Sequence, residues 1–326
     1  MSFPIDAVVT WVDGSDPAHA AKMHKYGKDT NFVDKDVAGA TRYANDGEIY
    51  RCVASIRKFA PFVRTIYIVT DNQDPHIPDG SIPVKVVDHR EIFHGYEKYL
   101  PVFNSIAIET MTWRIPGLAE HYIKFNDDLM LCAPAVPSDF FSSDGSPVAY
   151  TKPYSIPWVE FCQLLRPRKH GHKRIKFMWT TKNAARLAGA SLRMVKIYHT
   201  PQALNRRFFE EWFAAHPDQM EKNIAYRFRS ADQFNSEELY YYSMWKSKKM
   251  MMRNAKKTMF YFQPKSKKGY VERKLKRLDE GDWKFCCFNS LDTATDSERR
   301  AILDWMDRRV DWHAAGGEVE SNTVTR

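Results

Sequence analysis

The stretch Tyr122-Ile-Lys-Phe-Asn-Asp-Asp-Leu-Met-Leu131 is a short apolar strand that runs into Asn126, Asp127 and Asp128 and then turns apolar again. Two adjacent carboxylates in an apolar segment are costly, because buried charge requires a cation, a cationic side chain or a bound proton to compensate it. A metal ion at the end of the strand would do so. Asp also ends strands and starts turns, so these residues by themselves favour a metal site and a simple turn equally.

Strands and helices alternate on the N-terminal side of this stretch. Strands are expected over residues 5–12, 65–70 and 84–87, and helices over 48–59 and about 104–115, each halted by a proline. This order is typical of a wound α/β sheet, in which ligands bind at the carboxyl ends of the strands. Asn45-Asp-Gly-Glu48 has the spacing of a capping box for the first helix.

Acid or amide side chains follow several of these expected strands. They are Asp13, Asp71-Asn72, Asp88-His89 and Asn126-Asp127-Asp128. We therefore expect them to converge on one edge of the sheet, although the same residue types are also favoured in turns.

The composition is that of a folded protein without a membrane span. The chain has 326 residues, 44% of them hydrophobic, and its N-terminus lacks the charged and apolar regions of a signal peptide. Its five cysteines are an odd number without C-x-x-C spacing, which favours buried, reduced thiols. A cytoplasmic protein is the expectation, placed at the inner face of the membrane if its basic stretches bind lipid.

The net charge of +9 is concentrated in the second half, where residues 151–326 carry 35 Lys and Arg against 20 Asp and Glu. We interpret residues 1–150 as an α/β core and 151–326 as a basic, mainly helical part packed into the same unit. The excess charge predicts an anionic partner: phosphate, nucleic acid or an anionic membrane surface. The basic runs 166–176 and 246–277 are also typical of solvated surfaces.

Three sites in the second half carry chemistry. His199 precedes Thr200-Pro201, which predicts a helix start that would favour a phosphate beside His199; a packed histidine is the simpler alternative. Arg229 and Asp232 either pair with each other, or Arg229 binds a phosphate with two hydrogen bonds while Asp232 holds it in place. Asn289 follows the apolar strand predicted over 285–288 and offers a neutral oxygen.

Four blocks of the chain resemble the four regions that define the Stealth family of hexose-1-phosphate transferases, which includes bacterial capsule phosphotransferases and an animal N-acetylglucosamine-1-phosphotransferase. The blocks lie at residues 5–16, within 42–128, at 199–232 and at 285–289. Two departures occur. Gln202 stands where some members have a second His, and no acid follows Asn289.

The resemblance implies a glycosyltransferase-A-like, Rossmann-like central sheet flanked by helices, a UDP-sugar donor and Mg²⁺ or Mn²⁺. It implies transfer of a hexose-1-phosphate, such as N-acetylhexosamine-1-phosphate, to a glycan or lipid-linked glycan, with release of UMP. The implied catalytic residues are His199 as proton acceptor, Arg229, Asp127 and Asp232. The implied metal ligands are Asp128, Asp127 and Asn289, and the donor-binding residues are Trp11, Asp13, Gly14, Arg42, Asn45 and Asn72.

Three other classes compete with this interpretation. An ordinary metal-dependent glycosyltransferase would use the same acid pair but release UDP. A nucleic-acid-binding protein would account for the basic second half, yet it leaves the ordered acidic motifs without a role, so no nucleic-acid partner is expected. A carbohydrate-binding module would need neither His199 nor the acid pair.

Overall fold

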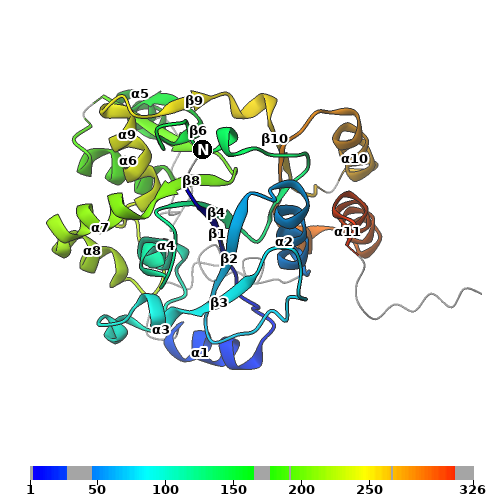
Figure 1. Ribbon diagram of the computed structural model, residues 1–326, viewed down its shortest axis with the longest axis horizontal. Helices are drawn as coiled ribbons and strands as arrows, with labels where there is room; N and C mark the ends of the chain where they lie inside the picture. The colour runs from blue at the N-terminus through cyan, green and yellow to red at the C-terminus, as the bar shows by residue number, and fades with distance from the viewer. Residues whose placement is uncertain (1–2, 28–45, 165–176, 191, 266, 313–326) are drawn as a thin grey trace, which may run out of the picture.

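The computed structural model describes residues 3–27, 46–164, 177–190, 192–265 and 267–312. A five-stranded sheet with the order β3-β2-β1-β4-β8 lies at its centre. Its strands are β1 (Ile5–Thr10), β2 (Val63–Thr70), β3 (Val84–Asp88), β4 (His121–Asn126) and β8 (Gln202–Asn205). The first four run parallel and β8 runs antiparallel to β4 (Figure 1). The wound α/β sheet is therefore confirmed.

Helices cover both faces of this sheet, because successive side chains of a strand point to opposite sides. Ala7 and Val9 of β1 pack with α2 (Glu48–Phe59), whereas Val8 packs with α4 (Ser105–Met111), α7 (Arg206–Ala215), α8 (Pro217–Ile224) and α9 (Ser236–Lys246). β1, β2 and β4 are thus largely buried on both faces, which explains why they read as mostly apolar runs, whereas the edge strand β3 has exposed residues.

Two smaller sheets complete the described part of the fold. One has the order β10-β11-β5, and the other has the order β7-β6-β9. Their strands are β5 (Leu129–Leu131), β6 (Val148–Ser155), β7 (Arg193–Ile197), β9 (Met251–Arg253), β10 (Met259–Phe262) and β11 (Phe285–Phe288). Because β8 and β11 pair with strands from the first 150 residues, the two parts of the chain share sheets.

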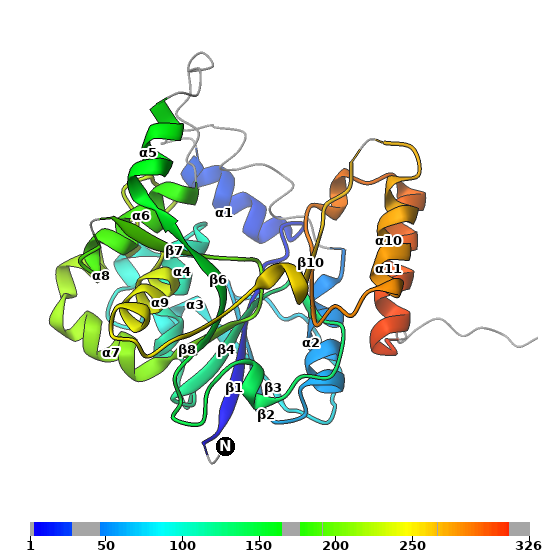
Figure 2. The same ribbon diagram turned by 90° about the horizontal axis from the view of Figure 1, so that it is seen from above.

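The remaining helices lie around these sheets, and Figure 2 shows α10 and α11 side by side at one end of the molecule. They are α1 (Pro17–Gly27), α3 (His89–Ile92), α5 (Ile156–Leu164), α6 (Phe177–Leu187), α10 (Tyr270–Glu280) and α11 (Asp296–Val310). Within the ranges that the structure describes, every helix is too short or too polar to cross a lipid bilayer. Cys52, Cys132, Cys286 and Cys287 are buried free thiols, as expected.

Two local predictions from the sequence are wrong. The chain after Thr200-Pro201 forms strand β8, and the next helix, α7, begins at Arg206 with Asn205 as its N-cap. Ala203 and Leu204 pack on opposite faces of the central sheet, an alternation that a strand satisfies and a helix does not.

The second wrong prediction concerns the start of α2. Its N-cap is Gly47, which has a φ of 76° and no side chain to cap with, in place of the expected Asn45. The Glu48 carboxylate instead accepts a hydrogen bond from the backbone N–H of Asp46 at 2.7 Å.

An ion pair between the buried Asp6 and the half-exposed Arg64 anchors β1 to β2. The fully buried Asp6 carboxylate accepts hydrogen bonds from Arg64 Nε (2.9 Å) and Nη2 (2.6 Å) and from the backbone N–H of Ala119 (2.7 Å). We expect Arg64→Ala to lower the free energy of unfolding by about 2 kcal/mol, because it leaves a buried carboxylate short of donors. Urea unfolding monitored by circular dichroism measures the loss.

Arg207→Ala is the matched control. Arg207 pairs with Glu211 at 2.7 Å, but both side chains are exposed, so its loss should leave the free energy of unfolding close to that of the wild type. Equal losses for the two variants would contradict the role given to the Asp6 pair.

Candidate active site

Asp127 and Asp128 form the turn that joins two sheets. β4 ends at Asn126 in the central sheet, and β5 begins at Leu129 in the sheet that contains β11. The backbone N–H of Phe288 donates to the carbonyl oxygen of Asp128 at 2.8 Å, which fixes the turn beside the end of β11. The residues do make a turn, as one interpretation predicted, but this turn also has the features of a site.

The Asp128 carboxylate is shielded from water and incompletely bonded. Its Oδ2 accepts from Asn289 Nδ2 and Cys287 Sγ, each at 3.3 Å, whereas its Oδ1 is buried with no hydrogen-bond partner. Within the described residues, no Lys or Arg forms an ion pair with Asp127 or Asp128. Negative charge therefore accumulates here without a cationic side chain in contact.

A third carboxylate faces the same turn. Burial raises the pKa of Asp127 well above its usual range, and the charges of Asp128 and Glu48 raise it further. Burial raises the pKa of Glu48 to about 7, with Asp46 and Asp128 contributing. The capping-box spacing indicated only a capping role for Glu48. Its nearness to the turn depends on how α2 packs against β5, which no local pattern reveals.

The acid turn fits a hard divalent cation. An unpartnered buried oxygen and uncompensated carboxylates are the features that a cation with oxygen ligands would satisfy. Asp127 and Asp128 would be its ligands. Asn289 directs its amide nitrogen at Asp128 while its Oδ1 accepts from Ser290 Oγ at 2.7 Å, so its oxygen would reach a cation only after the amide turns. Among the described residues, no three His, Cys, Asp or Glu side chains converge, which implies that water would supply further ligands.

His199 lies in the connection between β7 and β8, on the side of Asp128. Desolvation lowers the pKa of His199, although the residue is exposed; the charge of Asp128 opposes this shift, and Lys196 and Lys124 add to it. The ring lies 5.3 Å from that of Tyr261, centroid to centroid. His199 is therefore neutral at pH 7 and able to accept a proton. It does not precede a helix, so the expected helix-terminus phosphate site is absent there.

Arg229 contacts the start of α4, where its Nη2 donates to Ser105 Oγ. No ion pair joins Arg229 to Asp232 in the part of the chain that the structure describes, and the Asp232 side chain is exposed. The expected contact between the two is thus not found. Arg229 remains at the carboxyl edge of the sheet, because α4 follows β3 in the winding order and begins at that edge.

A buried ion cluster supports the end of β4. Lys124 Nζ contacts Glu109 Oε1 (2.7 Å), Glu237 Oε1 (3.3 Å) and Asn126 Oδ1 (2.6 Å). Burial raises the pKa of Glu237 to about 7 against the opposing charge of Lys124. This cluster was not predicted from the sequence, although a lysine inside an apolar strand was a signal that a carboxylate had to lie nearby.

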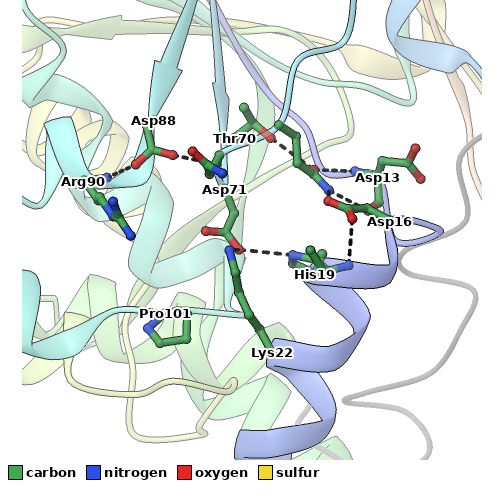
Figure 3. A network of polar contacts seen from close by, with 12 residues as sticks. Asp13, Asp16, His19, Lys22, Thr70, Asp71, Asp88, Arg90 and Pro101 are labelled. Carbon is green, nitrogen blue, oxygen red and sulfur yellow. Dashed lines mark hydrogen bonds and ion pairs between the residues drawn. The ribbon is translucent and has the colours of Figure 1, made fainter.

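The ends of the first three strands converge as expected (Figure 3). Gln73 accepts from the backbone N–H of Asp13 at 2.8 Å and donates to Asp16 Oδ2 at 2.9 Å. Asp71 contacts Lys22 Nζ at 3.0 Å and His19 Nδ1 at 3.3 Å, which ties α1 to the end of β2.

The remaining donor-binding predictions fall at the same edge or outside the described residues. The backbone N–H of Asn72 donates to Asp88 Oδ2 at 2.6 Å, linking the ends of β2 and β3. Trp11 is buried directly after β1, and Gly14 follows in the turn. Arg42 and Asn45 lie outside the described residues.

The fold and the site together define a wound α/β protein with an acidic turn and a neutral histidine at the carboxyl edge of its sheet. Family models match two segments of the chain: Stealth protein conserved region 1 over residues 3–30 and conserved region 2 over 42–149. The chain belongs to the Stealth family. The models do not extend to His199, Arg229 or Asn289, so the roles of these residues stay predictions.

Characterised relatives share much of this chain. An exopolysaccharide phosphotransferase of Streptomyces coelicolor is 37% identical over 231 residues, which are 71% of this chain and 37% of the relative. The capsular polysaccharide phosphotransferase LcbA of Aeromonas hydrophila is 30% identical over 239 residues, 72% of this chain and 64% of the relative. The chain thus spans less than two thirds of the length of either.

Two solved structures resemble the fold remotely. An active-site mutant of LgtC has a TM-score of 0.41 at 11% identity, covering 92% of this chain and 95% of LgtC. The bifunctional glycosyltransferase WbbM has a TM-score of 0.43 at 7% identity, covering 95% of this chain and 50% of WbbM. At these scores the likeness is too distant to indicate a shared activity.

The raised pKa of Glu48 predicts a pH-dependent stability. Its pKa rises from an ordinary value of 4.5 to about 7 in the folded protein, so stability falls as pH rises through that window and the full cost is present above pH 7. We expect Glu48→Gln to raise the free energy of unfolding by about 1–3 kcal/mol at pH 8 and by much less at pH 4.5. Urea unfolding at both pH values measures the difference.

Glu210→Gln is the control, because Glu210 is exposed and pairs only with Arg206 at 3.0 Å. It should leave the stability at pH 8 within about 0.5 kcal/mol of the wild type. A destabilised Glu48→Gln variant at pH 8 would show that the carboxylate is compensated in the folded protein.

Proposed function

We propose that this protein transfers a hexose-1-phosphate from a UDP-sugar to a hydroxyl group of a glycan acceptor in the synthesis of capsular or exopolysaccharide. The observation that carries the proposal is the Asp127-Asp128 turn, which forms no ion pair with a Lys or Arg among the described residues and lies within electrostatic reach of a neutral His199. The relatives named as polysaccharide phosphotransferases support the reaction class. The acceptor includes lipid-linked glycans, and the sugar is a hexose or an N-acetylhexosamine.

The reaction is an attack on phosphorus. An acceptor oxygen forms a bond to the phosphorus that carries the sugar, the bond from that phosphorus to the bridging oxygen breaks, and UMP leaves with the bridging oxygen. The product is a phosphodiester. Such displacements are accelerated mainly by positioning and by stabilising charge on the phosphoryl oxygens.

Three parts of the site serve these needs. His199 accepts the proton of the acceptor hydroxyl, because its pKa is lowered and the ring is neutral at pH 7. Arg229, oriented by its contact with Ser105, stabilises the attacked phosphoryl group. The ends of β1 and β2, with Trp11, Asp13 and Asn72, bind the nucleotide.

In this proposal the acid turn would hold Mg²⁺ or Mn²⁺. Asp127 and Asp128 are the protein ligands, and a bound cation would neutralise the charge of the diphosphate and its leaving group. Lys124 acts indirectly, since it fixes the Asn126 side chain next to the turn.

The identity of the leaving nucleotide tests the reaction class. We expect the purified protein, given a UDP-sugar and a glycan acceptor, to release UMP, and His199→Ala to lower kcat by about 100-fold to 10,000-fold because the proton acceptor is lost. Chromatography of the nucleotides measures both. Release of UDP instead would identify an ordinary glycosyltransferase. His216→Ala is the control, because His216 is exposed and stacks on Trp212 in α7, and it should keep full turnover.

Binding of a metal ion to the acid turn can be tested by thermal stability, without measuring turnover. We expect MgCl₂ or MnCl₂ to raise the melting temperature of the wild-type protein, since a cation at a hundredfold excess over its Kd adds about 2.7 kcal/mol of stability. Asp128→Asn should abolish this shift, whereas Asp144→Asn, in an exposed turn, should keep it. Differential scanning fluorimetry gives the shifts. Full turnover in EDTA would remove the metal from the mechanism.

A further inference from the structure

Helices α5 and α6, together with Leu192 just before β7, expose several large apolar side chains. Trp158 is 63% exposed, Phe161 49% and Leu192 65%, and Trp179 and Leu187 are also exposed. These five residues are called the aromatic surface below. They make up half of the exposed large hydrophobic residues in the described part of the chain, although α5 and α6 are only a small fraction of it.

The residues of this surface lie together. The rings of Trp158 and Phe161 are 5.7 Å apart, centroid to centroid. Glu160 of α5 pairs with Lys182 at 3.1 Å and Arg186 at 3.0 Å, both on α6, so the two helices meet at this residue. Lys182 Nζ lies 4.5 Å from the centre of the Trp179 ring. The acid within the surface is thus neutralised by two cations.

The composition of α5 does not suit an ordinary surface helix. Its sequence IPWVEFCQL has seven apolar residues among nine and only two polar ones, Glu160 and Gln163. A helix that is apolar all round is normally buried in protein or in lipid. Nine residues are too few to span a bilayer, which needs about 20, so burial in lipid would place this helix in the plane of the interface.

The charge beside the aromatic surface is positive. Arg186 and Arg193 are exposed next to Leu187 and Leu192. The sequence that connects α5 to α6 carries six Lys or Arg residues between 166 and 176 and no Asp or Glu. Anionic lipid headgroups attract such charge, each Lys or Arg contributing about 1 kcal/mol near the surface.

The aromatic surface also lies on the side of the molecule that carries the candidate active site. Figure 2 shows α5 projecting on the side where β1 ends and α1 lies. Because α1 is tied to Asp71 at the end of β2, this is the side of the carboxyl edge and of the candidate active site. A bilayer on α5 would therefore lie on the same side of the protein as the site.

We propose that the aromatic surface is a peripheral docking site for an anionic lipid bilayer, with Trp158, Phe161 and Leu192 entering the interface and the neighbouring cations contacting headgroups. Aromatic rings also stack on sugars, but two exposed leucines and an apolar helix match lipid better than a hydroxyl-rich glycan. The docking site is separate from the catalytic residues, and it needs no nucleotide sugar.

Vesicle sedimentation tests the proposal. The full-length protein, without nucleotide sugar, is spun with vesicles of phosphatidylglycerol and phosphatidylethanolamine or of phosphatidylcholine alone. We expect strong partitioning to the anionic vesicles and weak partitioning to phosphatidylcholine. The double variant Trp158→Ala, Phe161→Ala should lower the partition coefficient on anionic vesicles at least about tenfold, because two inserted rings are lost.

The control double variant is Val86→Ala, Val136→Ala. Both valines are exposed to a similar degree but lie outside the aromatic surface, so partitioning should match the wild type. Melting temperatures of all variants should stay near the wild-type value, since the replaced side chains are exposed. Unchanged partitioning of the Trp158/Phe161 variant, or no partitioning of the wild type, would overturn the proposal.

Native electrophoresis with acceptor polysaccharide distinguishes a surface that binds lipid from one that binds glycan. If the Trp158/Phe161 variant keeps its vesicle binding but is no longer retarded by acceptor polysaccharide in native electrophoresis, the surface binds glycan and the lipid proposal fails. UMP release with a short water-soluble acceptor should be the same in this variant as in the wild type. Failure of docking and failure of the proposed function are therefore distinguishable.

Discussion

The path of the chain from β4 to β5 determines the position of the candidate active site. β4 pairs with β1 and β8 in the central sheet, and after two residues the chain continues as β5, which pairs with β11. Those two residues are Asp127 and Asp128, and the bond from Phe288 N–H to the Asp128 carbonyl oxygen fixes them between the sheets. Because the turn belongs to both sheets, it cannot move without breaking the pairing of one of them. Rigidity of this kind is what a cation or a diphosphate requires of its ligands.

The stability of the fold is reduced where the chemistry is expected. Asp127 and Glu48 have raised pKa values because burial opposes their charge, and Asp128 Oδ1 has no partner. Two residues before the end of β4, the buried charge of Lys124 is compensated by the carboxylates of Glu109 and Glu237. The contrast shows that this fold can neutralise buried charge with its own side chains, and that at the acid turn it does not. Uncompensated charge of this kind is typical of functional sites.

Much of the central sheet was predictable from local pattern. Apolar runs and prolines located β1 to β4, α2 and α4, and strand-end acids indicated the carboxyl edge. The failures were also local. Thr200-Pro201 has good helix-start residues, yet Ala203 and Leu204 are drawn into β8 because the free edge of β4 offers hydrogen bonds and two apolar faces. Gly47 replaced Asn45 as the cap of α2, because tertiary packing of that helix sets where it begins.

The sequence by itself determined the wound α/β order, the acid pair at a strand end, and the family's ordered motifs, because periodicity and short motifs are properties of neighbouring residues. Only the tertiary structure decided which groups surround that pair. Glu48, Cys287 and Asn289 reach the turn through packing and strand pairing over long sequence separations, and Arg229 contacts Ser105 rather than Asp232. Likewise, only the folded surface shows that α5 leaves its rings exposed. Compensation of charge and burial of apolar area are long-range quantities, so no local pattern can fix them.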